Sequence, residues 1–168
     1  RPHFLFNTLN TGAALVHARP ADAEQLLLDL ADLFRAALAG PREIPLEDEL
    51  ALTRRYLEIE SLRFGKRLHV EWQLPDIIPN VATPTLSLQP LVENAILHGL
   101  LPKKNGGKIT LSSMRDADEI VLSVEDDGVG MDEATLKSVL VTNPLRRYIG
   151  LSNVNERWRS LFGVHSGL

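Results

Sequence analysis

The chain of 168 residues has no cysteine, which excludes disulfide scaffolds, thiol catalysis and cysteine-based zinc sites. It has no excess of positive charge either: 18 lysine and arginine residues stand against 22 aspartate and glutamate residues, a net charge of −4. Such a balance gives no electrostatic attraction to nucleic acid. No apolar run approaches the roughly 20 residues that a membrane-spanning helix needs. We therefore expect neither nucleic-acid contact nor membrane contact from this chain.

The composition is that of a globular protein, with 44% hydrophobic residues. The length suits one domain, or two small domains that share an interface. The sequence starts at Arg1 and Pro2 rather than at methionine, and it stops at Gly167 and Leu168. We interpret it as a fragment, whose sensor or membrane part is expected to lie outside it.

Helical periodicity dominates the first third of the chain. Apolar residues recur at helical spacing over residues 4–16 and again over 22–39, and a third helix is expected from residue 45 to about residue 64. Two helices joined by a short loop form an antiparallel hairpin. The apolar stripe over 22–39 is wider than one partner helix needs, which favours a dimeric four-helix bundle.

The pattern then changes to strands mixed with helices. Alternation predicts strands over residues 69–74, 108–113 and 120–125. Helices are expected over residues 85–98, 132–140 and 151–162. This second part is therefore predicted to be an α+β sandwich, in which a mostly antiparallel sheet lies under helices.

Two motifs in this second part point to a ligand. Asp126 follows a hydrophobic strand and precedes Gly128 and Gly130, so a ligand ring could approach the backbone closely. The alternative is an ordinary hairpin turn. Asn94 and His98 share one helix face, and an amide oxygen suits Mg²⁺ held mainly by nucleotide phosphates. The alternative there is a plain helix end.

Two further segments carry candidate chemistry. Gly150 opens a predicted helix, whose free N–H groups suit a phosphate, unless the segment is a simple loop-to-helix junction. His3 lies in an apolar helical segment with Asn7 one turn later. A neutral imidazole is a competent nucleophile toward phosphorus. A lone histidine is otherwise structural or merely solvated.

The order of these motifs resembles one known family. The stretches are RPHFLFNTLN (1–10), LEDELALTRRYLEIESLRFGKRL (46–68), LQPLVENAILHG (88–99), DDGVGM (126–131) and IGLSNVNERWRSLFG (149–163). Together they resemble the cytoplasmic kinase core of LytS-like sensor histidine kinases over nearly the whole chain. The three motifs HFLFN, LVENAxxHG and GLSNVxER, in that order, are far more specific than any single glycine motif.

The resemblance implies a fold and an activity. Residues 1–45 would form the dimerisation and phosphoacceptor hairpin, 46–66 a connecting helix, and 67–168 an ATP-binding domain truncated at its C-terminal end. That domain would be a GHKL (Bergerat-type) α/β sandwich with a mixed, mostly antiparallel sheet. ATP would phosphorylate a histidine of a homodimer, and the phosphoryl group would pass to a response regulator, often one with a LytTR DNA-binding domain. The parent would be a bacterial inner-membrane sensor with this part in the cytoplasm.

The resemblance also implies roles for individual residues. His3 matches the phosphoacceptor, and Asn7 the position that orients water for dephosphorylation of the regulator. Asn94 matches the Mg²⁺ ligand, with His98 beside it, and Asp126 the acceptor for the adenine amine. The remaining nucleotide-binding positions, beside the base and near the phosphates, are Gly128, Gly130, Gly150 and Leu151.

Some positions depart from the family pattern. Phe4 follows the acceptor, so the general base is unassigned; Glu93 is a candidate, although it points roughly 100° away from its neighbour Asn94 on a helix. Leu97 stands where relatives often carry lysine, for which His98 or Lys103 would have to substitute. Tyr148 replaces a glycine. These departures support an alternative function, a degenerate kinase that acts as a signalling scaffold with little ATP binding.

Overall fold

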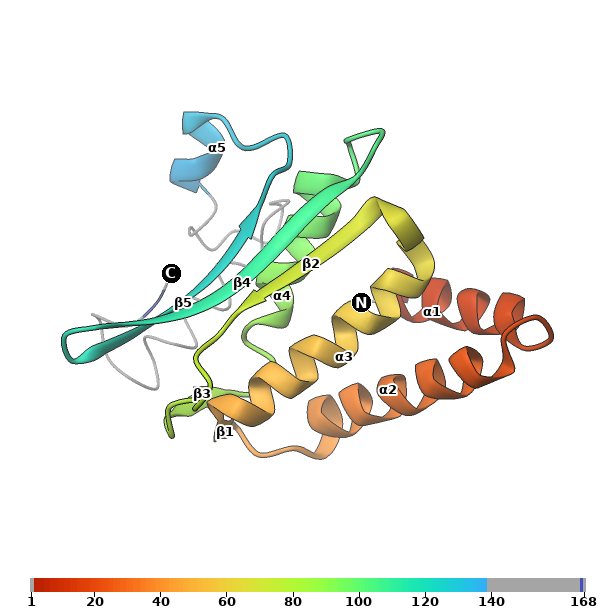
Figure 1. Cartoon of the computed structure of the whole chain (residues 1–168), viewed down its shortest axis with the longest axis horizontal. Helices are drawn as coiled ribbons and strands as arrows, with labels where there is room; N and C mark the ends of the chain where they lie inside the picture. The colour runs from red at the N-terminus through yellow and green to blue at the C-terminus, as the bar shows by residue number, and fades with distance from the viewer. Residues whose placement is uncertain (1, 139–166, 168) are drawn as a thin grey trace.

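In the computed structural model, which describes residues 2–138 and 167, long helices precede a sheet (Figure 1). Among the described residues no helix combines the length and the apolar character needed to cross a membrane. In chain order the elements are α1 (Pro2–Leu15), α2 (Pro20–Ala39), β1 (Glu43–Pro45), α3 (Leu46–Phe64), η1 (Gly65–Arg67), β2 (Leu68–Gln73), β3 (Ala82–Pro84), α4 (Gln89–Asn94), η2 (Ala95–Leu100), β4 (Gly107–Asp116), β5 (Glu119–Asp126) and α5 (Glu133–Ser138).

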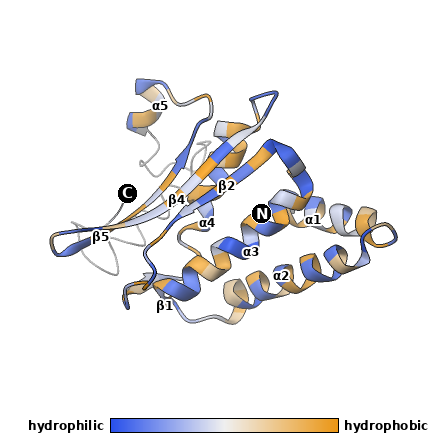
Figure 2. Ribbon diagram, in the orientation of Figure 1, coloured by the Kyte–Doolittle hydropathy of each residue, from blue (hydrophilic) through white to orange (hydrophobic). Residues whose placement is uncertain are grey.

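The helical hairpin predicted from the sequence is present, and α3 packs against both of its helices. Part of the wide apolar stripe of α2 is therefore buried within the chain, including Leu26 and Leu30. Another part stays exposed: Leu27 is 53% and Leu38 86% accessible. Figure 2 shows hydrophobic residues along α2 that are not confined to the side next to α3. The helix α3 is thus one of the partners against which the apolar stripe of α2 packs.

The predicted α+β sandwich is confirmed. Among the described strands, β4 lies between β2, with which it pairs in parallel, and β5, with which it pairs antiparallel. Alternate residues of β4, Ile109 and Leu111, are buried on the face that α3 and α4 cover. One hydrophobic cluster continues from Leu26 of α2 through Tyr56 of α3 and Val92 of α4 to this face of the sheet. The sheet and the hairpin are therefore joined through α3.

The helix predicted over residues 85–98 is confirmed over residues 89–98 and wrong over residues 85–88. The first four of these residues are not helical, because Leu86 has a φ of +57° and α4 begins only at Gln89. The segment Ala95–Leu100 is helical but has π-helical hydrogen bonding. Both departures coincide with contacts to distant parts of the chain, which local periodicity does not report.

A short antiparallel ribbon was also not expected from the sequence. β1 pairs with β3, with Ile44 opposite Thr83. The Leu46 N–H donates to the Val81 carbonyl at 2.9 Å and extends this contact into the start of α3. The ribbon joins the exit of the hairpin to the segment that leads into α4.

Candidate functional site

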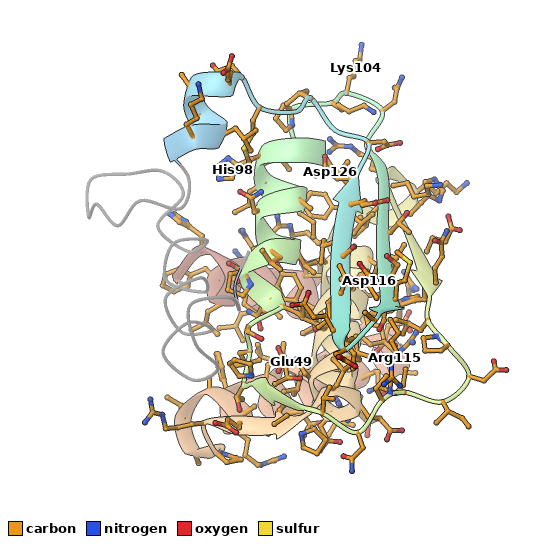
Figure 3. The ribbon with its side chains drawn as sticks, turned by 90° about the vertical axis from the view of Figure 1, so that its left-hand side faces the viewer. Glu49, His98, Lys104, Arg115, Asp116 and Asp126 are labelled. Atoms are coloured by element: carbon orange, nitrogen blue, oxygen red, sulfur yellow. The ribbon has the colours of Figure 1, made fainter. Side chains whose placement is uncertain are left out.

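The turn after β5 is bound to the end of the α4–η2 helix. Asp126 ends β5, and its Oδ1 accepts the N–H of Gly128 at 2.8 Å. The N–H of Val129 donates to the carbonyl of Gly99 at 3.1 Å. Figure 3 shows His98 and Asp126 at the same end of the structure, one from the helix and one from the strand. Two motifs far apart in the sequence are thus brought together.

Two glycines permit this contact. A Cβ added to Gly128 would lie 2.3 Å from the carbonyl carbon and oxygen of Gly99. A Cβ added to Gly99 would lie 2.4 Å from Oδ1 of Asp126. Glycine is required at Gly128 because the backbone of Gly99 approaches so closely, whereas a Cβ on Gly99 would displace the carboxylate of Asp126. Gly130 differs: its φ is +74°, and a Cβ there would meet nothing within 4 Å.

The two adjacent acids have different partners. Oδ1 of Asp127 accepts the N–H of Lys108 at 2.8 Å, and Nζ of Lys103 donates to the Asp127 carbonyl at 2.7 Å. The hydrogen bond from Lys108, together with the positive charge of Lys103, holds the pKa of the Asp127 carboxyl below its usual value. Lys103, considered above as a substitute for a phosphate-binding lysine, is engaged here by Asp127. Asp127 therefore ties the turn to β4, while Asp126 lies against the helix end.

Asn94 and His98 lie where the helix changes its hydrogen bonding. Asn94 ends α4, His98 lies within η2, and both side chains are half-buried. The Leu101 N–H donates to the carbonyl of Ile96 at 2.8 Å, five residues earlier. π-Helical turns are rare and frequent at functional sites. Gly99, which follows His98 directly, lies within this widened turn and accepts the hydrogen bond from the β5 turn.

Glu93 lies on another side of α4. It is buried, and its Oε1 accepts the Nε2 of Gln89 at 3.1 Å. Burial raises the pKa of Glu60 on α3 to about 7, with the negative charge of Glu93 adding to the rise and Arg63 opposing it. Glu93 thus belongs to a buried acidic pair between α3 and α4. Its role as a general base stays a prediction.

Replacing Glu60 by glutamine is expected to remove a pH dependence of stability. The folded protein holds this proton to about pH 7, whereas the ordinary pKa is 4.5. In the unchanged chain the free energy of unfolding should therefore fall by roughly 3 kcal/mol at most as the pH rises from 4.5 to about 7, and it should stay low at higher pH. In Glu60→Gln this fall should be absent. Urea unfolding at several pH values measures this. Glu24→Gln, on the exposed surface of α2, is the matched control; identical profiles for Glu60→Gln and the unchanged chain would contradict the expectation.

His3 and Asn7 lie on α1 and are exposed. Between them, the ring of Phe4 packs on Tyr56 of α3 with the ring centroids 5.1 Å apart. Figure 1 places the N-terminus beside α3, away from the end of β5 that leads to α5. The structure therefore does not bring His3 to the site at Asp126. The predicted positions Gly150 and Leu151, like Tyr148, lie outside the described residues.

Sequence reasoning missed the parts that Gly99 and Asp127 play in this site. No role of its own is predicted for Gly99 from the sequence, although this residue follows His98 directly and Gly128 follows shortly after Asp126. The engagement of Asp127 by Lys103 and Lys108 had no local signal, because the three residues lie on separate segments.

Two family models match the chain. Residues 1–68 match the family described as histidine kinase. Residues 83–167 match the family described as histidine kinase-, DNA gyrase B-, and HSP90-like ATPase. The first match ends at the first residue of β2, and the second begins within β3.

Curated relatives match nearly the whole chain. The sensor histidine kinase YpdA of Escherichia coli K12 is 35% identical over 164 residues, which is 96% of this chain and 29% of YpdA. The sensor histidine kinase BtsS of the same strain is 35% identical over 168 residues, 99% of this chain and 28% of BtsS. The sensor histidine kinase/phosphatase LytS of Staphylococcus aureus MRSA252 is 35% identical over 173 residues, 99% of this chain and 30% of LytS. The chain thus spans less than a third of the length of these relatives.

Proposed function

Since this chain belongs to the histidine kinase family of LytS, YpdA and BtsS, we propose that it transfers the γ-phosphoryl group of ATP to its own His3 and then to an aspartate of a response regulator. The observation that carries the proposal is the contact between the β5 turn and the end of η2. It places Asp126 beside the end of the helical run that carries His98 and, one turn earlier, Asn94. The parent protein would be an inner-membrane sensor with this part in the cytoplasm.

The adenine base would be recognised by Asp126. Its carboxylate is solvent-exposed at the end of β5, and an ionised carboxylate accepts hydrogen bonds only, which suits the exocyclic amine of adenine. Gly130 offers open space and a left-handed backbone beside it. Gly128 supports the site differently, by allowing the turn to reach Gly99.

The donor set fits an ion that arrives with the nucleotide. No group of three or more acidic or histidine side chains that could hold a metal occurs in the described part of the chain. The amide oxygen of Asn94 would therefore share the ion with phosphate oxygens, as Mg²⁺ in nucleotide sites commonly requires. When bound, Mg²⁺ would neutralise charge on the phosphates.

The transfer step uses a nitrogen of the His3 imidazole. This nitrogen attacks the γ-phosphorus with its lone pair, the bond from the γ-phosphorus to the β–γ bridging oxygen breaks, and ADP leaves with that electron pair. The proton on the other ring nitrogen passes to water. In the structure the start of α1, which carries His3, is apart from the end of β5, which carries Asp126 (Figure 1). The hairpin and the ATPase-like domain, of one chain or of two, must therefore approach each other for the transfer.

A homodimer is part of the proposal. Exposed apolar residues remain on both helices of the hairpin after α3 has packed against it: Phe6 is 61%, Leu9 45% and Leu28 54% accessible. Such a surface supports a second hairpin as the partner in a four-helix bundle. The partner of the phosphorylated form would be a response regulator, of the kind that carries a LytTR domain.

The test is incubation of the chain with γ-labelled ATP and Mg²⁺. We expect label on the protein that is labile to acid and stable to alkali, as a phosphohistidine is. Absence of label contradicts the proposed autokinase. If ADP then also fails to raise the melting temperature, the scaffold function is favoured, because a ligand that binds the folded state must stabilise it.

Replacing Asn7 by alanine should separate two activities. Asn7 is exposed one turn after His3, where it can orient water toward a phosphorylated regulator. We expect autophosphorylation to stay within about twofold and regulator dephosphorylation to fall by at least about tenfold. Both rates are followed with labelled protein and purified regulator. Asn10→Ala, exposed further along α1, is the control, and an equal loss of both rates in Asn7→Ala would contradict the role.

A further inference from the structure

The segment between β3 and α4 is held in an unfavourable conformation. Leu86 has a φ of +57°, a region that leucine rarely adopts. On either side of it, Oγ1 of Thr83 and Oγ of Ser87 are buried, and neither has a hydrogen-bond partner within residues 2–138. Such strain persists only where the surroundings over-determine the backbone. Something outside the segment must therefore hold it.

Glu49 of α3 supplies that hold. Its side chain is fully buried; Oε2 accepts the N–H of Leu86 at 2.8 Å, and Oε1 accepts the N–H of Leu88 at 3.1 Å. A buried carboxylate is tolerated only when it is well hydrogen-bonded, and bonds to a charged acceptor are stronger than neutral ones. One side chain thus fixes both amides that flank Ser87.

The same segment is tied to the exit of the hairpin. The N–H of Thr85 donates to the carbonyl of Arg42 at 3.0 Å, and Oγ1 of Thr85 donates to the carbonyl of Pro41. β1 and β3 pair directly before it. The loop after α2, the start of α3 and the entry to α4 therefore form one hydrogen-bonded unit.

The helix that follows depends on this anchor. α4 has six residues, and its N-cap, Leu88, makes no side-chain capping bond. A helix this short has little stability of its own. Glu49 binds the backbone N–H of that N-cap residue. Asn94 ends α4, His98 lies further along the same helical run, and Figure 3 shows Glu49 and His98 at opposite ends of it.

We propose that Glu49 is a positioning residue, whose buried carboxylate sets the start of α4 and thereby the place of Asn94 relative to the hairpin that carries His3. It touches no substrate and acts through the backbone of residues 86–88. The proposal rests on the proposed function, because Asn94 is taken as the ligand of a nucleotide-bound Mg²⁺.

The test compares Glu49→Gln with Thr53→Val in the full chain. Glutamine keeps the size of the side chain but replaces one acceptor oxygen by an N–H₂ group that opposes a backbone N–H. Thr53 is equally buried one turn later on α3. Among the described residues its hydroxyl donates only to the carbonyl of Glu49, so its loss controls for a general drop in stability.

Hydrogen exchange without nucleotide is the first measurement. Amides of residues 89–98 should exchange at least about tenfold faster in Glu49→Gln, and not in Thr53→Val. Unchanged exchange over residues 89–98 overturns the proposal. If Glu49→Gln does not fold, Glu49→Asp, which keeps the charge but shortens the reach, is measured with the same criterion.

Calorimetric titration with ADP is the second measurement. The dissociation constant of ADP in EDTA divided by that in Mg²⁺ measures how much the ion strengthens binding. In Glu49→Gln this ratio should be at least about fivefold smaller than in the unchanged chain, since a displaced Asn94 no longer meets the ion. A ratio equal to that of Thr53→Val overturns the positioning role alone. If the unchanged chain binds ADP equally well with and without Mg²⁺, the metal role of Asn94 fails and the positioning role fails with it.

Discussion

Replacing His3 by glutamine is expected to reduce acid-labile labelling from γ-labelled ATP to background, at least about a hundredfold below the unchanged chain. Glutamine offers no nucleophilic nitrogen, whereas imidazole does. His3 is exposed on α1, so its loss should leave the melting temperature and the binding of ADP unchanged. Loss of label with retained ADP binding would separate the acceptor from the nucleotide site.

His17 provides the matched control for this variant. It is also exposed, in the turn that follows α1, and His17→Gln removes one imidazole without touching the position that the family motif assigns. Labelling of His17→Gln should equal that of the unchanged chain. If His3→Gln were labelled as strongly as the unchanged chain, His3 could not be the acceptor.

Replacing Gly128 by alanine is expected to weaken ADP binding by at least about tenfold and to lower stability by about 1–3 kcal/mol. The added Cβ would lie 2.3–2.4 Å from three backbone atoms of Gly99. Backbone atoms cannot swing aside as the end of a flexible side chain can. The turn must therefore separate from η2, which breaks the Val129–Gly99 hydrogen bond and moves Asp126.

Titration calorimetry with ADP and thermal unfolding measure the two effects, and Gly12→Ala is the matched control. A Cβ on Gly12, within α1, would lie 3.5 Å from Cδ2 of Leu26, an ordinary contact. Alanine is the better helix former by about 1 kcal/mol, so this variant should be neutral or more stable. Tight ADP binding by Gly128→Ala would show that the contact between the turn and η2 is not needed, and would count against the site.

The local sequence pattern predicted correctly those helices and strands whose signals lie within the element itself. The predicted helix over residues 22–39 corresponds to α2, because its apolar stripe and the proline and glycine at its ends act locally. The strand predicted over 120–125 lies within β5 for the same reason, since alternation is visible in six residues. Such elements need no information about their partners.

Local pattern failed where a distant group decides the backbone. β1 and β3 have three residues each, too few for any periodicity, and each exists because the other lies beside it. No propensity puts leucine at a φ of +57°, and Leu86 adopts it where its N–H meets the carboxylate of Glu49. The π-helical turn is a similar case, since Gly99 within it meets the β5 turn.

The sequence by itself determined the residue types and their order: a histidine near the start, an asparagine-bearing helix, and an acid after a hydrophobic strand. These follow from local periodicity and from motif resemblance, which depend only on neighbours along the chain. Tertiary structure alone decided which of two adjacent acids faces the helix and which ties the turn to β4. It also decided that α4 begins on a carboxylate from α3, because hydrogen bonds between distant segments depend on the packing that brings them together.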